Sequence, residues 1–206
     1  MKKPVFLDGK RTCLRPIQMK DLESFYRWFN DPKLRMFLLL PFPTTRTGEK
    51  EFIRRVTKLK DAVVRSIIVK KGGRLIGNMS LFKIDNVSRK AELGIAIADL
   101  EMTSRGYGPE AMALMLDYAF RTLNLHRVWL SVHAFNERAK KAYLSLGFVE
   151  EGRLRESYFW DGKYHDDILM GILRDGWDAK RHPSIHIGTA FQQRRTSRSW
   201  RRHSGS

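Results

Sequence analysis

Cysteine is nearly absent from this chain: Cys13 is the single example among 206 residues. One thiol excludes an internal disulfide, and chains without disulfides are typical of reducing compartments. His182 and His186 have a spacing that could suit a metal ion, but Pro183 lies between them and there is no cysteine to join them. We therefore expect no metal site.

Long apolar runs are also missing. Runs such as Met36–Leu40 and Ala111–Leu116 are far shorter than the roughly 18 apolar residues that span a bilayer. Residues 1–8 carry a basic flank but no apolar core of signal-peptide length. These absences predict a cytoplasmic protein without a membrane segment.

Acidic residues are scarce relative to basic ones. The chain has 22 Asp and Glu against 39 Lys and Arg, a formal net charge of +17. Such a charge attracts nucleic acid, acidic lipid or a phosphorylated cofactor, although a merely basic surface on a soluble protein is the plainer interpretation. Because 42% of the residues are hydrophobic, the chain can bury a core and is not wholly disordered.

The composition changes near the C-terminus. Residues 178–206 hold seven Lys or Arg and one acidic residue, and Arg, Ser and Gln dominate their final part. This pattern predicts a flexible basic tail, which is a candidate contact for RNA or the ribosome. The domain that precedes it is expected to span residues 1–177.

Hydrophobic periodicity predicts an α+β domain. Strands are expected at Arg11–Pro16, Val63–Lys70, Leu75–Ile84, Ala91–Ala98, Arg127–Val132, from Phe148 to a hairpin turn at Asp161-Gly162, and at Asp167–Leu173. Helices are expected at Lys20–Phe29, Thr47–Lys58, Gly108–Leu123 and Asn136–Leu146. The order indicates a mixed, mostly antiparallel twisted sheet of about seven strands flanked by helices. His126 and His133 flank one strand and are expected to be structural.

A glycine-containing turn precedes the third expected helix, in the stretch Glu101–Ala111. Gly106 and Gly108 let the backbone approach a ligand closely, and the helix N-terminus adds a positive dipole end. Together they favour a cradle for a pyrophosphate. Taken alone, the pattern fits equally well a loop that only connects a strand to a helix and binds no ligand.

A second pattern decides between these interpretations. Asn136, Ala139, Tyr143 and the pair Gly147-Phe148 have the spacing found in a late helix of the GNAT superfamily of N-acetyltransferases, which the chain resembles. Gly106 and Gly108 match the first motif of that superfamily. Thr103 departs from it, because the family usually has Gln or Arg there, and nearby Arg105 is a candidate to supply the charge.

The resemblance extends over about residues 12–177. The segments Leu123–Arg127, Gly147–Gly152, Trp28–Pro32 and Asp161–Asp166 are similar to the branch that holds spermidine acetyltransferases and ribosomal-protein N-terminal (alanine) acetyltransferases. The resemblance implies the GNAT fold and the use of acetyl-CoA.

The resemblance also implies roles for individual residues. The backbone of Ala96, Ile97 and Ala98 would pair with the pantetheine arm of the cofactor, and the Asn136 side chain would bind the cofactor too. The pyrophosphate would lie on the turn that contains Thr103, Ser104, Arg105, Gly106, Tyr107 and Gly108.

Two further residues would take part in the chemistry. Tyr143 would return a proton to the departing thiolate, unless it is only a packed core aromatic. An amine with a pKa of about 10 is mostly charged at neutral pH, so a base is needed. Glu92 is the candidate base; a surface-strand glutamate is the alternative.

The acceptor is less constrained than the cofactor. A +17 protein repels a polycation unless its pocket is locally acidic, and Asp21, Glu23 and Asp31 could form such an acidic cluster. A protein N-terminal amine is therefore the favoured acceptor. A polyamine or other small amine is the alternative, and an RNA- or ribosome-binding module on an acetyltransferase fold is an alternative of another class. A homo-oligomer is compatible with the sequence.

Overall fold

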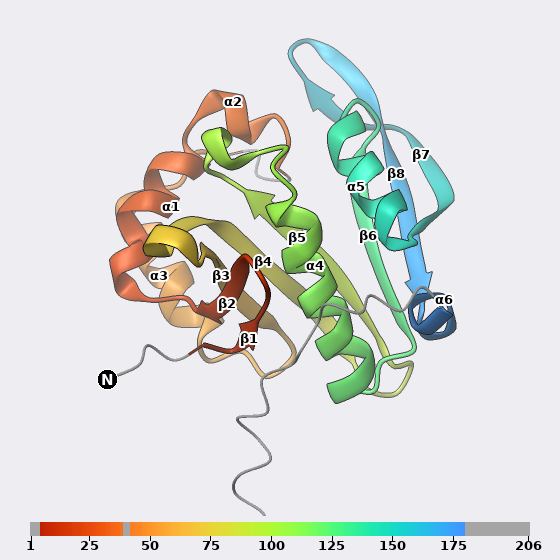
Figure 1. Ribbon diagram of the computed structural model, residues 1–206. Coiled ribbons are helices and arrows are strands. Elements are labelled where there is room, and N and C mark those ends of the chain that lie inside the picture. The colour runs from red at the N-terminus through yellow and green to blue at the C-terminus, as the bar shows by residue number, and fades with distance from the viewer. Residues whose placement is uncertain (1–4, 39–41, 180–206) are drawn as a thin grey trace, which may run out of the picture.

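The computed structural model describes residues 5–38 and 42–179. Its centre is an eight-stranded sheet in the order β1-β2-β3-β4-β5-β6-β8-β7 (Figure 1). The strands are β1 Leu7–Asp8, β2 Thr12–Pro16, β3 Val63–Val69, β4 Arg74–Asp85, β5 Lys90–Ile97, β6 Arg127–His133, β7 Val149–Trp160 and β8 Lys163–Leu173. Neighbouring strands are antiparallel except for β5 and β6, which run parallel.

The predicted mixed, mostly antiparallel sheet is confirmed. It has one strand more than expected. The additional strand is β1, which contains only two residues and pairs Leu7 with Leu14. A pair of residues is too short to give an alternation in the sequence.

The helices flank the sheet on both faces. They are η1 Met19–Asp21, α1 Leu22–Phe29, α2 Pro32–Arg35, α3 Arg46–Val56, η2 Lys71–Gly73, η3 Leu100–Met102, α4 Tyr107–Asp117, the π-helical turn η4 Tyr118–Thr122, α5 Glu137–Leu146 and α6 Arg174–Ala179. Strand alternation divides the core in two: Leu81 packs with α4 and α5, whereas the next residue, Phe82, packs with α1 and α3.

Several short elements differ from the sequence patterns. Helix α2 forms because the Asp31 side chain caps it by accepting a hydrogen bond from Lys33 N, with Pro32 in the first turn. The π-helical turn η4 continues α4 over the end of the expected helix. Helix α6 seats Trp177 in the core, where its Nε1–H donates to Asp117 Oδ1 at 2.9 Å.

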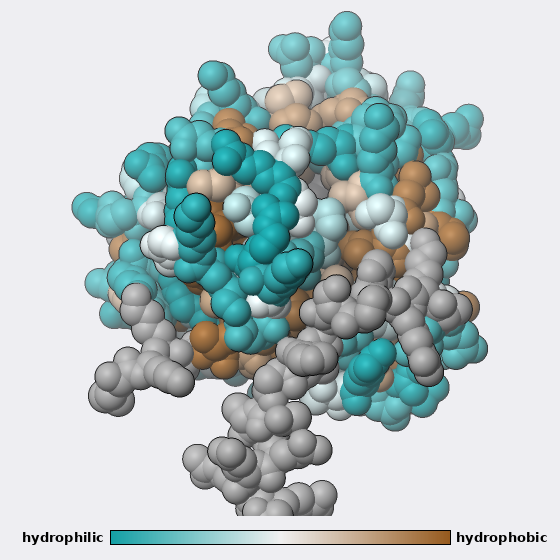
Figure 2. All heavy atoms as spheres, viewed as in Figure 1, coloured by the Kyte–Doolittle hydropathy of each residue, from teal (hydrophilic) through white to brown (hydrophobic). Residues whose placement is uncertain are grey.

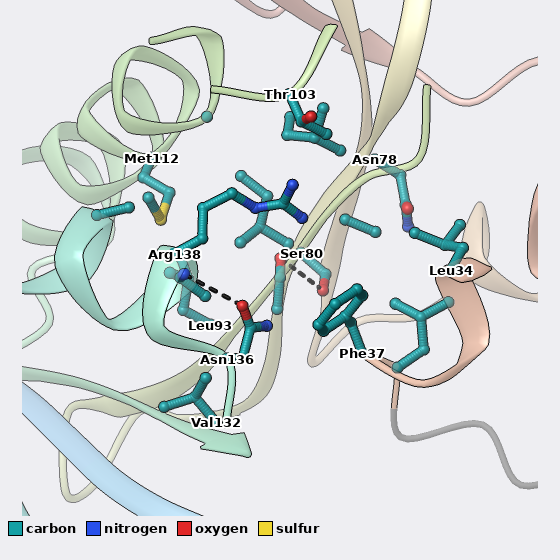
Figure 3. Close-up of a pocket in the computed structure, with 18 of the residues that line it drawn as sticks. Leu34, Phe37, Asn78, Ser80, Leu93, Thr103, Met112, Val132, Asn136 and Arg138 are labelled. Atoms are coloured by element: carbon teal, nitrogen blue, oxygen red, sulfur yellow. Dashed lines mark hydrogen bonds between the residues drawn. The ribbon is translucent and has the colours of Figure 1, made fainter. Parts of the chain in front are cut away.

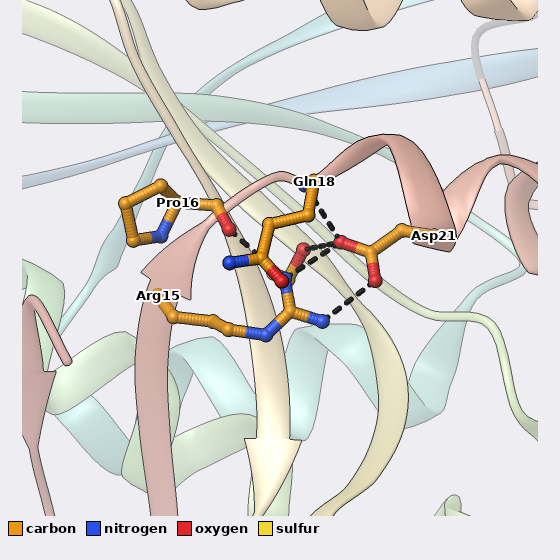
Figure 4. Close-up of polar contacts among 5 residues, drawn as sticks. Arg15, Pro16, Gln18 and Asp21 are labelled. Atoms are coloured by element: carbon orange, nitrogen blue, oxygen red, sulfur yellow. Dashed lines mark hydrogen bonds and ion pairs between the residues drawn. The ribbon is translucent and has the colours of Figure 1, made fainter. Parts of the chain in front are cut away.

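A buried ion pair joins the first helical segment to the sheet (Figure 4). Arg15 on β2 binds Asp21 in a bidentate manner, with N···O distances of 2.6 and 2.7 Å. Asp21 also accepts hydrogen bonds from Gln18 N and Ser66 Oγ, each at 2.9 Å. Burial alone would raise the pKa of Asp21, but these donors outweigh it and hold that pKa below its ordinary value of 3.8.

The outer surface reflects the composition. Hydrophilic side chains dominate the face shown in Figure 2, with hydrophobic residues in separate small groups. Within residues 5–38 and 42–179, none of the helices combines the length and apolar character needed to cross a bilayer. The boundary expected between residues 177 and 178 falls inside α6 and stays a prediction.

Candidate active site

The site is built where two parallel strands separate. Strands β5 and β6 pair only at Lys90↔Arg127, Ala91↔Val128 and Glu92↔Trp129. Beyond Glu92, β5 continues to Ile97 paired with β4 alone, and β6 continues to His133 paired with β8 alone. The edge of β5 that faces β6 therefore lacks a strand partner along residues 93–97, and its backbone groups are free for a ligand.

Close packing of β4 supports this open edge from behind. Gly77 pairs with Ile97, and a Cβ atom at Gly77 would lie 1.9 Å from the carbonyl oxygen of Ala96. Only glycine fits there.

A cavity of about 700 Å³ lies where β5 and β6 separate. Of the predicted site residues, the following line it: Glu92, Ala96, Ile97, Thr103, Ser104, Gly106, Gly108, Asn136 and Tyr143. Ala98, Arg105 and Tyr107 do not line it. The N–H of Ala98 donates to Ile76 O at 2.8 Å, so this group is not available to a cofactor.

The turn before α4 has the conformation of an anion cradle. Ser104 and Gly106 both have positive φ values, of +57° and +80°, and Gly106 is the N-cap residue of α4. The first N–H groups of the helix then point away from its body, toward a ligand. The Thr103 hydroxyl donates to Leu100 O at 2.8 Å, so it stabilises the turn itself.

The cation beside this turn is Arg11. Its Nη2 donates to Arg105 O at 2.9 Å, its guanidinium lies 4.3 Å from the centroid of the Tyr107 ring, and its Nη1 is 3.4 Å from where a Cβ of Gly106 would be. Arg11 lies between β1 and β2, far away in the sequence, so no local motif could have identified it. Arg11 is therefore a cation at this turn that the pattern missed, and the role expected of Arg105 stays a prediction.

Helix α5 and its N-cap residue bring three polar side chains to the cavity. Asn136 caps the helix, accepting a hydrogen bond from Ala139 N at 3.2 Å, which leaves its Nδ2 donor for a ligand. Figure 3 shows the Arg138 side chain extending into the cavity on the side of Thr103. Tyr143 is buried, and burial raises its pKa to about 12. Its hydroxyl forms no hydrogen bond with any described residue, and it is protonated at physiological pH.

The cavity is also lined by aromatic side chains and by two carboxyl groups. Its apolar wall consists of Phe29, Leu34, Phe37, Phe42, Phe52 and Phe82. The Glu92 carboxylate lies 2.7 Å from Lys83 Nζ, in a geometry too bent for a hydrogen bond. Glu49 is 4% exposed, and its Oε1 has no hydrogen-bond partner among the described residues. Burial raises the pKa of Glu49 to about 7.

Sequence reasoning missed Glu49, although a signal existed. Glu49, Ile53 and Val56 are the buried residues of α3, at i, i+4 and i+7, so a carboxyl group occupies the apolar stripe of the helix. A charged residue in such a stripe is rarely buried without a purpose.

The expected acidic cluster does not form an acceptor site. Asp21 is committed to Arg15, Glu23 pairs with Arg46, and Asp31 caps α2. None of the three lines the cavity. In the described parts of the chain, no group of three His, Cys, Asp or Glu side chains is arranged to hold a metal ion.

Comparisons with known proteins agree with this geometry. Residues 11–149 match the acetyltransferase (GNAT) domain family. The spermidine N(1)-acetyltransferase of Vibrio cholerae is 38% identical over 168 residues, which cover 81% of this chain and 95% of that protein. The Escherichia coli K12 enzyme of the same name is 30% identical over 162 residues, covering 78% and 85%. A putative ribosomal N-acetyltransferase of Bacillus subtilis is 34% identical over 109 residues, covering 53% and 59%.

The fold is shared as well. The crystal structure of Vibrio cholerae spermidine N-acetyltransferase in complex with CoA and spermine superimposes with a TM-score of 0.75 and 28% identity, covering 81% of this chain and 98% of that one. The chain belongs to the GNAT family of acetyltransferases. Enzymes of this family transfer an acetyl group from acetyl-CoA, so the expected acyltransferase class and co-substrate are confirmed.

Proposed function

We propose that this enzyme transfers the acetyl group of acetyl-CoA to a primary amine of a polyamine-type small molecule. The observation that carries the proposal is the pair of carboxyl groups, Glu49 and Glu92, set in a wall of phenylalanine side chains. Carboxylates and aromatic faces both attract ammonium groups. An aliphatic chain between two ammonium groups suits the apolar surface that separates them.

Other residues of the same cavity suit the co-substrate. The unpaired edge at Ala96 and Ile97 offers backbone groups to an amide-containing arm, as a neighbouring strand would. The turn from Ser104 to Gly108 offers N–H groups to a pyrophosphate, with Arg11 and Arg138 as nearby cations. The Asn136 Nδ2 group adds a donor.

Tyr143 supplies the proton that the departing thiolate needs. Tyr143 lines the cavity. Its raised pKa keeps the hydroxyl neutral and able to donate a proton. Nothing else among the described residues competes for the hydroxyl. Tyr143 therefore combines position, protonation state and a free donor.

The carboxyl groups resolve the difficulty that the net charge raises. The chain as a whole is strongly positive, but a site responds to its own charges more than to distant ones, which salt screens. Glu49 is buried and unpaired, so it gains most when an ammonium group replaces its missing partner. Glu92 already has Lys83 and gains less.

The other expectations stay predictions. A protein N-terminal amine as acceptor has the partial relative from Bacillus subtilis in its favour, whereas the more completely covered relatives are spermidine acetyltransferases. The basic tail, which is expected to contact RNA or the ribosome, lies outside the described residues apart from 178 and 179. Cytoplasmic location and a homo-oligomer are untested, although a dodecameric structure is known for the Vibrio cholerae enzyme.

An acetyl-transfer screen tests the proposal. Spermidine, spermine, butylamine and a peptide with a free N-terminus are each supplied with acetyl-CoA, and release of the CoA thiol is measured. We expect the highest kcat/KM with the polyamines. Transfer to the peptide without transfer to any polyamine would overturn the proposal.

A pair of variants sharpens the test. In Glu49→Gln, loss of a charge-assisted contact should raise KM for polyamines about 10- to 100-fold. The KM for butylamine, which has no second ammonium group, should change much less. Glu51→Gln is the control, since Glu51 lies on the exposed face of the same helix. Equal effects of the two substitutions would remove Glu49 from acceptor binding.

A further inference from the structure

A buried imidazole lines the same cavity. His133 is the last residue of β6 and is 2% exposed. Its neighbours Ser131 and Val132 also line the cavity. The sequence suggested a structural histidine, but a purely structural histidine does not need to face a ligand cavity.

The ring of His133 is held in one orientation. Its Nδ1 lies 2.6 Å from Asp167 Oδ1, and these two residues are paired across β6 and β8. The other oxygen of Asp167 accepts a hydrogen bond from Ser157 Oγ at 2.5 Å. Tyr158 stacks on the imidazole with centroids 3.8 Å apart, and Phe135 stacks with centroids 5.3 Å apart.

This arrangement determines which nitrogen carries the proton. A carboxylate can only accept, so Nδ1 of His133 donates to Asp167 and the lone pair of the neutral ring lies on Nε2. Nε2 is buried and has no hydrogen-bond partner within residues 5–38 and 42–179. A buried acceptor without a donor is rare in proteins, so Nε2 is free to accept a proton from a group in the cavity.

We propose that Nε2 of His133 is the proton acceptor for the substrate ammonium group, with Asp167 as its positioning residue. The proposal rests on the proposed function, because it requires an amine that is charged in solution. It assigns the task expected of Glu92 to His133. Glu92 is less suited to it, because its carboxylate already lies 2.7 Å from the Lys83 ammonium.

The proton balance is complete. His133 Nε2 removes one proton from the ammonium group, and the neutral amine attacks the thioester carbonyl. The C–N bond forms and the C–S bond breaks, the thiolate takes a proton from Tyr143, and the second proton of the attacking nitrogen restores the tyrosine hydroxyl. His133 then releases its proton to solvent, so each turnover yields one amide, one thiol and one proton.

The charged and titratable groups around His133 are few. Asp167 faces it from β8 and Tyr158 from β7, with Arg35 of α2 close to Tyr158. Across the cavity lie Glu92 of β5 and Arg138 of α5. Among the described residues Asp167 alone hydrogen-bonds to the ring, so it fixes the orientation and tautomer of the imidazole.

Two acceptors of different basicity test the proposal. A polyamine is protonated at neutral pH and needs a base, whereas 2,2,2-trifluoroethylamine is largely unprotonated and does not. For His133→Gln we expect kcat/KM to fall about 100-fold with the polyamine and less than about 5-fold with trifluoroethylamine. Raising the pH should recover about tenfold in rate per unit with the polyamine, because the free amine becomes more abundant.

Controls separate catalysis from folding. His126→Gln changes an exposed histidine just before the same strand and should leave both acceptors unaffected. Asp167→Asn should reproduce the acceptor-dependent loss, because the amide favours the tautomer with the proton on Nε2. Thermal stabilisation by acetyl-CoA should persist in all variants.

The outcomes distinguish the two proposals. Equal losses with both acceptors, or wild-type rates with both, would overturn the role of His133. If wild-type enzyme acetylates peptides and no polyamine, the proposed acceptor is wrong. The same comparison of protonated and unprotonated amines, made on peptides with N-terminal groups of different basicity, then still tests His133.

Discussion

Replacing Glu49 by glutamine should alter the pH dependence of stability in a direction that the structure specifies. The pKa of the Glu49 carboxyl is raised from 4.5 to about 7 in the folded protein. Below the lower value the carboxyl is neutral in both the folded and the unfolded chain. As the pH rises through the higher value, the folded chain must hold a buried charge, and the stability gained from the neutral group is lost.

The size of the effect follows from the shift. An increase of 2.5 units, from 4.5 to 7, corresponds to at most about 3.4 kcal/mol at 1.36 kcal/mol per unit. Water reaches the cavity beside the carboxyl, so we expect roughly half, about 1.5 to 2 kcal/mol. Glutamine resembles the neutral acid and does not titrate. Replacing Glu49 by glutamine should therefore remove the loss of stability at high pH.

Urea unfolding at pH 5, 6, 7 and 8 measures the effect. The free energy of unfolding of Glu49→Gln, minus that of wild type, should increase by about 1.5 to 2 kcal/mol from pH 5 to pH 8. Glu51→Gln should follow wild type throughout. Spermidine at pH 8 should stabilise wild type more than Glu49→Gln. Parallel pH curves for wild type and Glu49→Gln would refute the reasoning.

Three further predictions concern other parts of the molecule. Tyr143→Phe should slow turnover at least about 100-fold while thermal stabilisation by acetyl-CoA persists, with the exposed Tyr164→Phe as control; unchanged turnover would remove Tyr143 from its role. Asp21→Asn should lower the free energy of unfolding at pH 7 by about 3 to 5 kcal/mol, because Arg15 would be left buried without its partner. Since the pKa of Asp21 is depressed below 3.8, wild type should also lose stability as the pH falls through that range, and a urea titration in which Asp21→Asn matches wild type at pH 7 would contradict the role of the ion pair. Deleting residues 179–206 should weaken RNA binding and spare acetylation of a small amine; loss of both would place the tail within the fold.

Local features of the site were predictable, whereas distant partners were not. Gly106 and Asn136 act through the backbone of the helices that they begin, so a motif of a few residues suffices to identify them. Glu49 and His133 line the same cavity from separate segments, and Arg11 contacts the turn before α4 from a third. Their roles depend on strand order and on burial, which local spacing does not encode. Only the strand order and register of the sheet show that these residues lie near one another.

Hydrogen exchange would reveal how the two parts of the sheet are joined. Three residue pairs form the whole seam between β1–β5 and the block of β6, β8 and β7. Past these pairs the two parts of the sheet are joined through the helices packed on them, and a pantetheine arm bound to both parts would add a further connection. Amides of Leu93–Ile97 and Ser131–His133 should exchange faster than their neighbours and slow down together on acetyl-CoA binding. The concentration of acetyl-CoA would then determine how rigid these two strands are, as well as how fast the enzyme turns over.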